Sequence, residues 1–330
     1  MRATLLDILR CPETGQRLAA RDAVERDGDI ESGDLVTEDG LHRYPIVNGI
    51  PRFVPSDNYA ASFGFQWHRF GATQLDSTSG VPISRDRFLS FSGWTPAELA
   101  GKRVLDVGCG AGRFTEIALA CGARVVAIDY SSAVDVCKAN HGTNPRLDVV
   151  QADIYRLPFA PEKFDYVYCF GVLQHTPDVA AAFKALPPQL APGGSIAVDI
   201  YPRLRLNFLW PKYWLRPITR HIAPPRLFRL VERVVPRLLP VSRLLGRVPG
   251  IGRKLRHVIP VMNYEGVLPL SERQLEEWAV LDTFDMLSPT HDHPQNARTL
   301  RRWFAEAGLT EVWVGRPGFL VGRGRKPTRG

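Results

Sequence analysis

Short apolar runs alternate with amphipathic segments of helical period between residues 102 and 202. The apolar runs are RVLDVG, ARVVAIDY, LDVVQAD, FDYVYCFG and SIAVDIY, which begin at residues 103, 123, 147, 164 and 195. Runs this short and this rich in valine and isoleucine predict buried strands. Helices are expected to begin between them, at Arg113, Ala133 and Asp178. Strands and helices in near-strict alternation predict a parallel sheet with helices on both faces.

The segments on either side of this alternation predict further units. Residues 1–56 open with a short helix, LLDILRCP, and close on the proline-rich run YPIVNGIPRFVP, which predicts a small α+β domain. Residues 57–100 are expected to be helical and rich in aromatic side chains. After the fifth strand, residues 203–294 predict a helical insertion. A last helix, ARTLRRWFAEAG, and two short strands, TEVWVG and GFLVGRG, complete a sheet domain formed by residues 101–202 and 295–326.

Composition and cysteine usage indicate an ordinary globular protein of a reducing compartment. The 330 residues are 45% hydrophobic and 23% charged, and the five cysteines include no Cys-x-x-Cys pair. The N-terminal residues lack the apolar core of a signal peptide, and no run approaches the roughly 18 apolar residues of a membrane-spanning helix. A cytoplasmic protein is therefore expected.

The net charge of +8 is unevenly distributed along the chain. Residues 201–260 contain fourteen Lys or Arg and a single acid, Glu232, so this window carries +13 and the rest of the chain carries −5. A local basic surface usually meets phosphate groups or anionic lipid.

The first predicted strand runs into three glycines, Gly108, Gly110 and Gly112, at the start of the first helix. A dinucleotide fingerprint needs its third glycine at position 113, which is an arginine here, and a phosphate-binding loop needs a Gly-Lys-Ser/Thr ending that is absent. The turn is therefore expected to approach a ligand closely without cradling a pyrophosphate. Asp106, two residues before the first glycine, would repel a phosphate but would suit an ammonium group.

The run Asp-Val-Gly-Cys-Gly-Ala-Gly resembles the first motif of class I S-adenosylmethionine-dependent methyltransferases, such as those of ubiquinone and menaquinone biosynthesis. Later segments, up to residue 202, resemble the later motifs of that family in the same order. The resemblance implies a Rossmann-like, doubly wound, mostly parallel seven-stranded sheet, with S-adenosyl-L-methionine as the cofactor. The cofactor-binding residues that it implies are Asp106, Gly108, Gly110, Gly112, Asp129, Tyr130, Asp153, Ile154, Phe170 and Gly171.

Acids at the ends of strands make the most specific of these implied contacts. In the family, an acid placed like Asp129 accepts hydrogen bonds from both ribose hydroxyls, and an acid placed like Asp153 binds the adenine amine. The alternative is that these acids and Asp106 only cap the helices that follow them. Three acids in register with the glycines favour the cofactor-binding interpretation.

Three histidines are candidate catalytic residues. His175 directly follows the fourth strand, at the sheet edge where α/β proteins bind ligands, and an imidazole titrates near neutral pH. It is the candidate general base for an acceptor hydroxyl, with helix capping as the alternative. His291 and His293 lie in DTFDMLSPTHDHPQ, which is expected to be a polar, turn-rich loop over the acceptor. No established metal-ligand spacing is present there, so no metal site is predicted.

Residues 63–70, FGFQWHRF, resemble the N-terminal lid that many such enzymes close over the cofactor. Ordinary core packing of these aromatic side chains is the alternative.

Residues 1–56 resemble the small zinc-binding activator domain of tRNA and protein methyltransferases, through LLDILRCP and YPIVNGIP. In that family the Cys-Pro pair begins a Cys-Pro-x-Cys knuckle, whereas here Cys11 is followed by Pro12, Glu13 and Thr14. One thiolate cannot make a tetrahedral zinc site. The domain is therefore expected to keep its shape and to lack zinc.

These resemblances predict an enzyme that methylates a hydroxyl of a small-molecule, sugar or lipid-linked acceptor. The alternatives are an RNA methyltransferase that holds phosphates with residues 203–258, and a non-catalytic binding scaffold of the same fold. Nucleic acid is not the expected partner, because the amino-base methylase motif is absent after the fourth strand.

The basic segment at residues 203–258 has two interpretations. Apolar residues at helical spacing, arginines three or four apart and the aromatics Phe208, Trp210, Tyr213 and Trp214 predict either a cap over the acceptor pocket or a peripheral membrane contact. Pro236 and Pro240 are expected to kink or break the helix.

Overall fold

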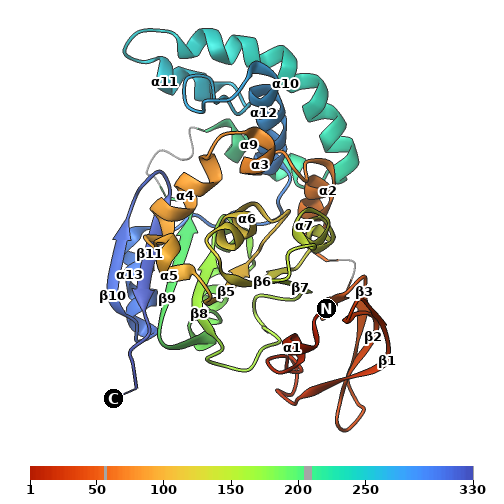
Figure 1. The fold of residues 1–330 in the computed structure, drawn as a ribbon. Helices are drawn as coiled ribbons and strands as arrows, with labels where there is room; N and C mark the ends of the chain where they lie inside the picture. The colour runs from red at the N-terminus through yellow and green to blue at the C-terminus, as the bar shows by residue number, and fades with distance from the viewer. Residues whose placement is uncertain (56–57, 204–209, 330) are drawn as a thin grey trace.

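The computed structural model describes residues 1–55, 58–203 and 210–329. The expected boundary between residues 56 and 57 falls outside these residues, as does Phe208. Figure 1 shows a central sheet covered by helices, a small sheet at the N-terminal end and a helical layer formed by the insertion.

The central sheet has seven strands in the order β10-β11-β9-β8-β5-β6-β7. Its five parallel strands are β5 (Arg103–Val107), β6 (Arg124–Asp129), β7 (Leu147–Gln151), β8 (Phe164–Cys169) and β9 (Leu190–Ile200). The two closing strands, β10 (Thr310–Gly315) and β11 (Leu320–Arg325), pair antiparallel to each other, and β11 also pairs antiparallel with β9. The predicted seven-stranded, mostly parallel sheet is confirmed.

Helices cover both faces of this sheet, because successive side chains of each strand point to opposite sides. On one face, Val104 packs with α4 (Ile83–Ser92), α6 (Arg113–Ala120) and α7 (Ala133–His141). On the other face, Leu105 packs with α8 (Val179–Lys184) and α13 (Ala297–Glu306). The short helices α3 (Asp76–Ser79) and α5 (Pro96–Leu99) flank α4, and α2 (Ala61–Arg69) precedes them.

The N-terminal unit is a four-stranded antiparallel sheet with one short helix. Its elements are α1 (Ala3–Leu6), β1 (Leu18–Arg26), β2 (Asp29–Thr37), β3 (Arg43–Val47) and β4 (Ile50–Pro51). Arg52 joins it to the central sheet, since its guanidinium donates to Asp135 at 2.5 and 3.1 Å and to Gln151 at 2.9 Å. The Cys11 thiol lies 3.2 Å from the Tyr44 hydroxyl. No cluster of metal-ligating side chains occurs among the described residues.

The insertion after β9 consists of α9 (Pro211–Thr219), α10 (Pro224–Gly246), α11 (Gly252–Leu255) and α12 (Glu272–Leu287). Its own apolar core joins Leu227, Val231 and Val235 of α10 to Phe284 of α12. This core is separate from the two apolar cores that pack on the central sheet.

Helix α10 continues through both of its prolines, so of the two predicted outcomes, a kink or a break, the break is wrong. Pro236 and Pro240 both lie on the exposed face of the helix. Water can therefore bond the carbonyl groups that a proline leaves without a backbone donor.

Candidate active site

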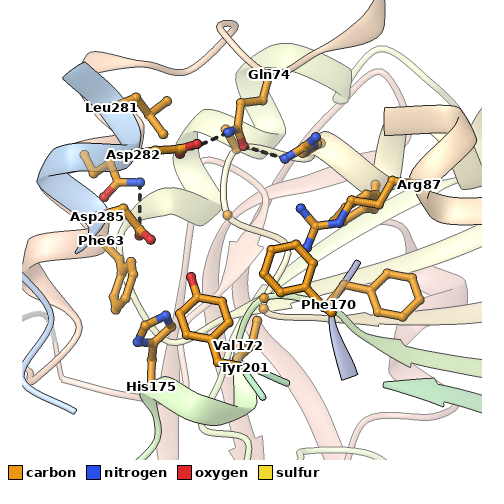
Figure 2. Close-up of a pocket in the computed structure, with 18 of the residues that line it drawn as sticks. Phe63, Gln74, Arg87, Phe170, Val172, His175, Tyr201, Leu281, Asp282 and Asp285 are labelled. Carbon is orange, nitrogen blue, oxygen red and sulfur yellow. Dashed lines mark hydrogen bonds between the residues drawn. The ribbon is translucent and has the colours of Figure 1, made fainter. Parts of the chain in front are cut away.

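One cavity of about 880 Å³ lies at the carboxyl ends of the parallel strands. Its walls come from the loops after β5, β6, β8, β9 and β10, from the helices α2 and α4, and from the insertion through α9 and α12. This volume is near the upper end of the usual range for small-molecule sites, so the cavity has room for more than one compact ligand. Figure 2 shows the side chains that converge in it.

The glycine turn after β5 forms part of the cavity wall. Gly108 and Gly110 line it with φ of 80° and 52°, a region that favours glycine. A side chain at Gly108 would overlap Val172, and one at Gly110 would meet the indole of Trp67. The backbone is therefore packed so closely that only glycine lets the turn approach a ligand.

Asp129, at the end of β6, holds the turn and faces the cavity. Its carboxylate accepts from the Gly110 amide at 3.0 Å and from the amide and hydroxyl of Ser131 at 2.8 and 2.7 Å. Burial raises the pKa of Asp129. No Lys, Arg or His side chain in the described part of the chain forms an ion pair with this carboxylate. Its charge is therefore available to hydroxyl groups of a ligand.

Other predicted cofactor-binding residues also line the cavity. They are Tyr130, Ile154, Phe170 and Gly171. Tyr130 stacks on Tyr59, with ring centroids 4.8 Å apart.

Three predicted cofactor-binding residues do not line the cavity, and the structure gives each a different role. Asp106 is buried and accepts from the Thr115 hydroxyl at 2.5 Å, and burial raises its pKa to about 7. Gly112 is the residue that precedes α6, with φ of 91°. The Asp153 carboxylate accepts from the Tyr155 amide at 3.0 Å. Direct contact of these three with the cofactor stays a prediction.

His175 lines the cavity and is 7% exposed. Its Nδ1 lies 3.0 Å from the carbonyl oxygen of His291. A carbonyl can only accept, so Nδ1 carries the proton and Nε2 keeps a lone pair. Burial lowers the pKa of His175 to about 4, so the ring is neutral at neutral pH.

His291 and His293 are not among the residues that line the cavity, and catalytic roles for their side chains stay predictions. His291 contributes its carbonyl group to His175, whereas its ring packs against the rings of Tyr59 and His293. His293 is exposed, and its amide donates to the carbonyl of Gln174 at 2.8 Å. Main-chain groups of this segment, not its imidazoles, reach the site.

The aromatic residues of α2 and Phe70, which follows it, serve both predicted roles, and Trp67 serves both at once. Phe63 and Trp67 line the cavity. Phe65 and Phe70 pack instead with the apolar core of the insertion.

The largest feature missed from the sequence is a polar wall contributed partly by the insertion. We use "polar wall" for the side chains of Gln74, Arg87, Arg113, Tyr201, Tyr264, Asp282 and Asp285, all of which line the cavity. Asp282 and Asp285 lie in α12, which runs to Leu287, so the expected turn-rich loop is helical over its first half. Burial raises the pKa of each carboxyl to about 6. Two acids three residues apart on an otherwise apolar helix face were the available signal.

The sequence matches two families of known domains. Residues 105–198 match the methyltransferase domain family, and residues 2–49 match the Trm112p-like protein family. The chain contains a methyltransferase domain. Both predicted resemblances are confirmed, and the glycine turn, Asp129 and His175 belong to this domain.

Curated relatives match parts of the chain at 30–38% identity. An uncharacterised protein of Synechococcus sp. is 30% identical over 227 residues, which are 64% of this chain and 48% of that protein. The ubiquinone biosynthesis O-methyltransferase of Marinobacter nauticus is 38% identical over 117 residues, 34% of this chain and 49% of the relative. The chain spans about half the length of these curated relatives. Human N-acetylserotonin methyltransferase, solved in complex with SAM, is 16% identical, with a TM-score of 0.45 over 83% of this chain and 61% of its own.

The methyltransferase domain indicates S-adenosylmethionine as its cofactor, and the cavity fits that molecule. Asp129, Ile154 and Tyr130 line the cavity, so the Asp129 carboxylate would be placed to bind the ribose hydroxyls and the two other side chains to contact the adenine, as predicted. The turn at Gly108 and Gly110 leaves room for the methionine end.

Replacing Asp129 with alanine should weaken binding of S-adenosylmethionine by about 10- to 100-fold, because charge-assisted hydrogen bonds contribute about 1.5–3 kcal/mol. Titration calorimetry measures this change, and Glu276→Ala, an exposed acid of α12, is the control that should leave affinity unchanged. Heat of binding with NAD but none with S-adenosylmethionine on the wild-type protein would overturn the cofactor assignment.

Proposed function

We propose that this protein transfers the methyl group of S-adenosylmethionine to a hydroxyl of a small-molecule, sugar or lipid-linked acceptor, with His175 as the general base. The observation that carries this proposal is the hydrogen bond from His175 Nδ1 to the His291 carbonyl, inside the cavity that the glycine turn also lines. Because Nδ1 carries its proton in this bond, Nε2 is the ring nitrogen that can accept a proton from the acceptor hydroxyl.

The cofactor supplies a methyl group already activated on a sulfonium, so the protein's own task is limited to the acceptor. As the acceptor oxygen bonds to the methyl carbon and the carbon–sulfur bond breaks, the hydroxyl proton moves to Nε2 of His175. The resulting imidazolium then returns the proton to water. The low pKa of His175 favours this return and keeps the ring neutral before each turnover.

Two aromatic side chains, Phe63 of α2 and Tyr201 after β9, exclude water from the His175 ring. Phe63 packs against the His175 ring with centroids 5.2 Å apart, and Tyr201 packs against it at 5.5 Å. These rings shield the base and limit hydrolysis of the activated methyl group. The name of the Marinobacter relative, an O-methyltransferase, supports an oxygen as the accepting atom.

We propose further that the insertion contacts anionic membrane surfaces with the outer face of α10, which supports a lipid-linked source for the acceptor. Within the described part of the chain no helix is long and apolar enough to span a bilayer. The exposed side of α10 interleaves arginines with apolar side chains, in the order Arg226, Leu230, Arg233, Arg237, Val241 and Leu244. Leu230 is 50% exposed and Leu244 is 68% exposed. Apolar residues among basic ones are typical of helices that lie in a membrane interface.

Replacing His175 with alanine should lower kcat by roughly 10²–10⁴, the usual contribution of a general base, and should leave affinity for S-adenosylmethionine unchanged. Turnover with labelled cofactor measures the first quantity and calorimetry the second. Retained turnover, or a loss confined to cofactor binding, would contradict the role of His175 as the base.

The membrane proposal predicts co-flotation with vesicles that contain phosphatidylglycerol, weaker co-flotation with pure phosphatidylcholine, and release as salt is raised. The double variant Leu230→Ser, Leu244→Ser should float less, because it removes the exposed apolar contacts. Leu41→Ser, at a residue of the N-terminal unit that is 79% exposed, is the matched control and should float like the wild type. Absence of binding to anionic vesicles at low salt would contradict the proposal.

A further inference from the structure

The polar wall on the insertion side of the cavity is more elaborate than proton transfer requires. His175 alone accounts for removal of a proton, yet seven further polar side chains line the same space. Buried polar groups cost free energy unless they are hydrogen-bonded, so such a wall indicates a polar ligand.

Part of the polar wall is a chain of side chains that hydrogen-bond to one another. Arg113 donates to the Ser84 hydroxyl at 2.9 Å and to the Gln74 amide oxygen at 3.0 Å. Gln74 donates in turn to Asp282 at 3.4 Å, and the Tyr264 hydroxyl donates to the other oxygen of Asp282. Asp282 therefore holds the Gln74 and Tyr264 side chains in place through hydrogen bonds.

Asp285, one turn further along α12, is only partly satisfied. Its Oδ1 accepts from the Gln66 amide at 3.5 Å, and its Oδ2 has no hydrogen bond within the described part of the chain. The Tyr201 hydroxyl also has no hydrogen bond among the described residues. Figure 2 shows Asp285, Tyr201 and His175 around one part of the cavity. Asp285 Oδ2, the Tyr201 hydroxyl and His175 Nε2 can thus each form a hydrogen bond with a ligand in the same part of the cavity.

The lining contains acids and bases in equal number. Among the described residues the cavity is lined by four acids, Asp86, Asp129, Asp282 and Asp285, and by four bases, Arg87, Arg113, Lys212 and Arg316. Two of these bases already pair with buried acids behind the lining, Arg87 with Asp199 at 2.9 Å and Lys212 with Asp292 at 3.1 Å, so an anionic acceptor would find no excess of basic charge here. Arginines only donate and carboxylates only accept, so the wall as a whole suits groups that can do both, as hydroxyls do.

We propose that the polar wall binds a neutral, hydroxyl-rich acceptor, a sugar ring or polyol, and that Asp285 and Tyr201 orient it by binding a hydroxyl next to the one that is methylated. A hydroxyl there donates to Asp285 Oδ2 and accepts from Tyr201, which satisfies both groups, whereas an ammonium group only donates and could not accept the Tyr201 proton. Trp278, Phe170 and Phe319 line the cavity as well and provide aromatic faces for the apolar side of a sugar ring. This inference rests on the proposed methyl transfer to oxygen.

The test begins with identification of the methylated product. The full-length protein and labelled S-adenosylmethionine are incubated with aqueous and lipid fractions of a cell extract, and the labelled product is hydrolysed and analysed by mass spectrometry. An O-methylated sugar or polyol is expected, and the fraction that yields it separates a free sugar from a glycolipid. A labelled phenol ether would overturn the inference while leaving methyl transfer to a hydroxyl intact, and a methyl ester or methylamine would overturn both. Absence of any labelled product would contradict both.

Asp285→Asn then tests the residue with the purified acceptor. The variant should raise KM for that acceptor about 10- to 100-fold, because it removes a charge-assisted hydrogen bond, with cofactor affinity within about twofold of wild type. His175→Ala should by contrast lower kcat. Glu276→Gln, the same acid-to-amide change at an exposed site of α12, should alter neither constant. An unchanged KM in a folded Asp285→Asn variant would overturn the role of Asp285.

Discussion

The carbonyl group of His291 is the point at which the two halves of the active site are fixed to each other. It accepts a hydrogen bond from His175 at 3.0 Å and another from Arg216 of α9 at 2.6 Å. Arg216 also pairs with Asp292 at 2.6 Å, and Lys212 pairs with the same carboxylate at 3.1 Å. All three side chains of this ion cluster are largely buried, and removal of one partner would leave an uncompensated charge. The orientation of His175 therefore depends on contacts with the insertion, which lies outside the central sheet.

This coupling explains why the insertion matters for chemistry as well as for covering the site. The glycine turn and Asp129 belong to the methyltransferase domain, whereas Asp282 and Asp285 come from the insertion. In the proposed function, a cofactor half and an acceptor half meet in one cavity, and the relative placement of the two would set the reacting geometry. Small changes in that placement have large effects on rate, because in-line transfer requires close alignment.

Local signals made the sheet, the glycine turn and the position of His175 predictable from the sequence. Each depends on residues within one strand–turn–helix unit, such as the run from Arg103 to Arg113. The contributions of the insertion were less accessible, because Asp285 meets Gln66 across 219 positions of the chain. The sequence also could not show that His291 acts through its main chain, since any residue at that position carries a carbonyl group. The unbroken path of α10 through Pro236 and Pro240 depends on which face is solvated, and that face is set by packing on α12.

A crystal structure of the protein with S-adenosylhomocysteine would test most directly the claim that one cavity joins a cofactor half to an acceptor half. The account predicts that the ribose contacts the Asp129 carboxylate. It also predicts that the sulfur faces the space between His175, Tyr201 and Asp285, where an acceptor hydroxyl can lie in line with it. A sulfur that faces away from this space, or a ligand bound outside the cavity, would contradict the account.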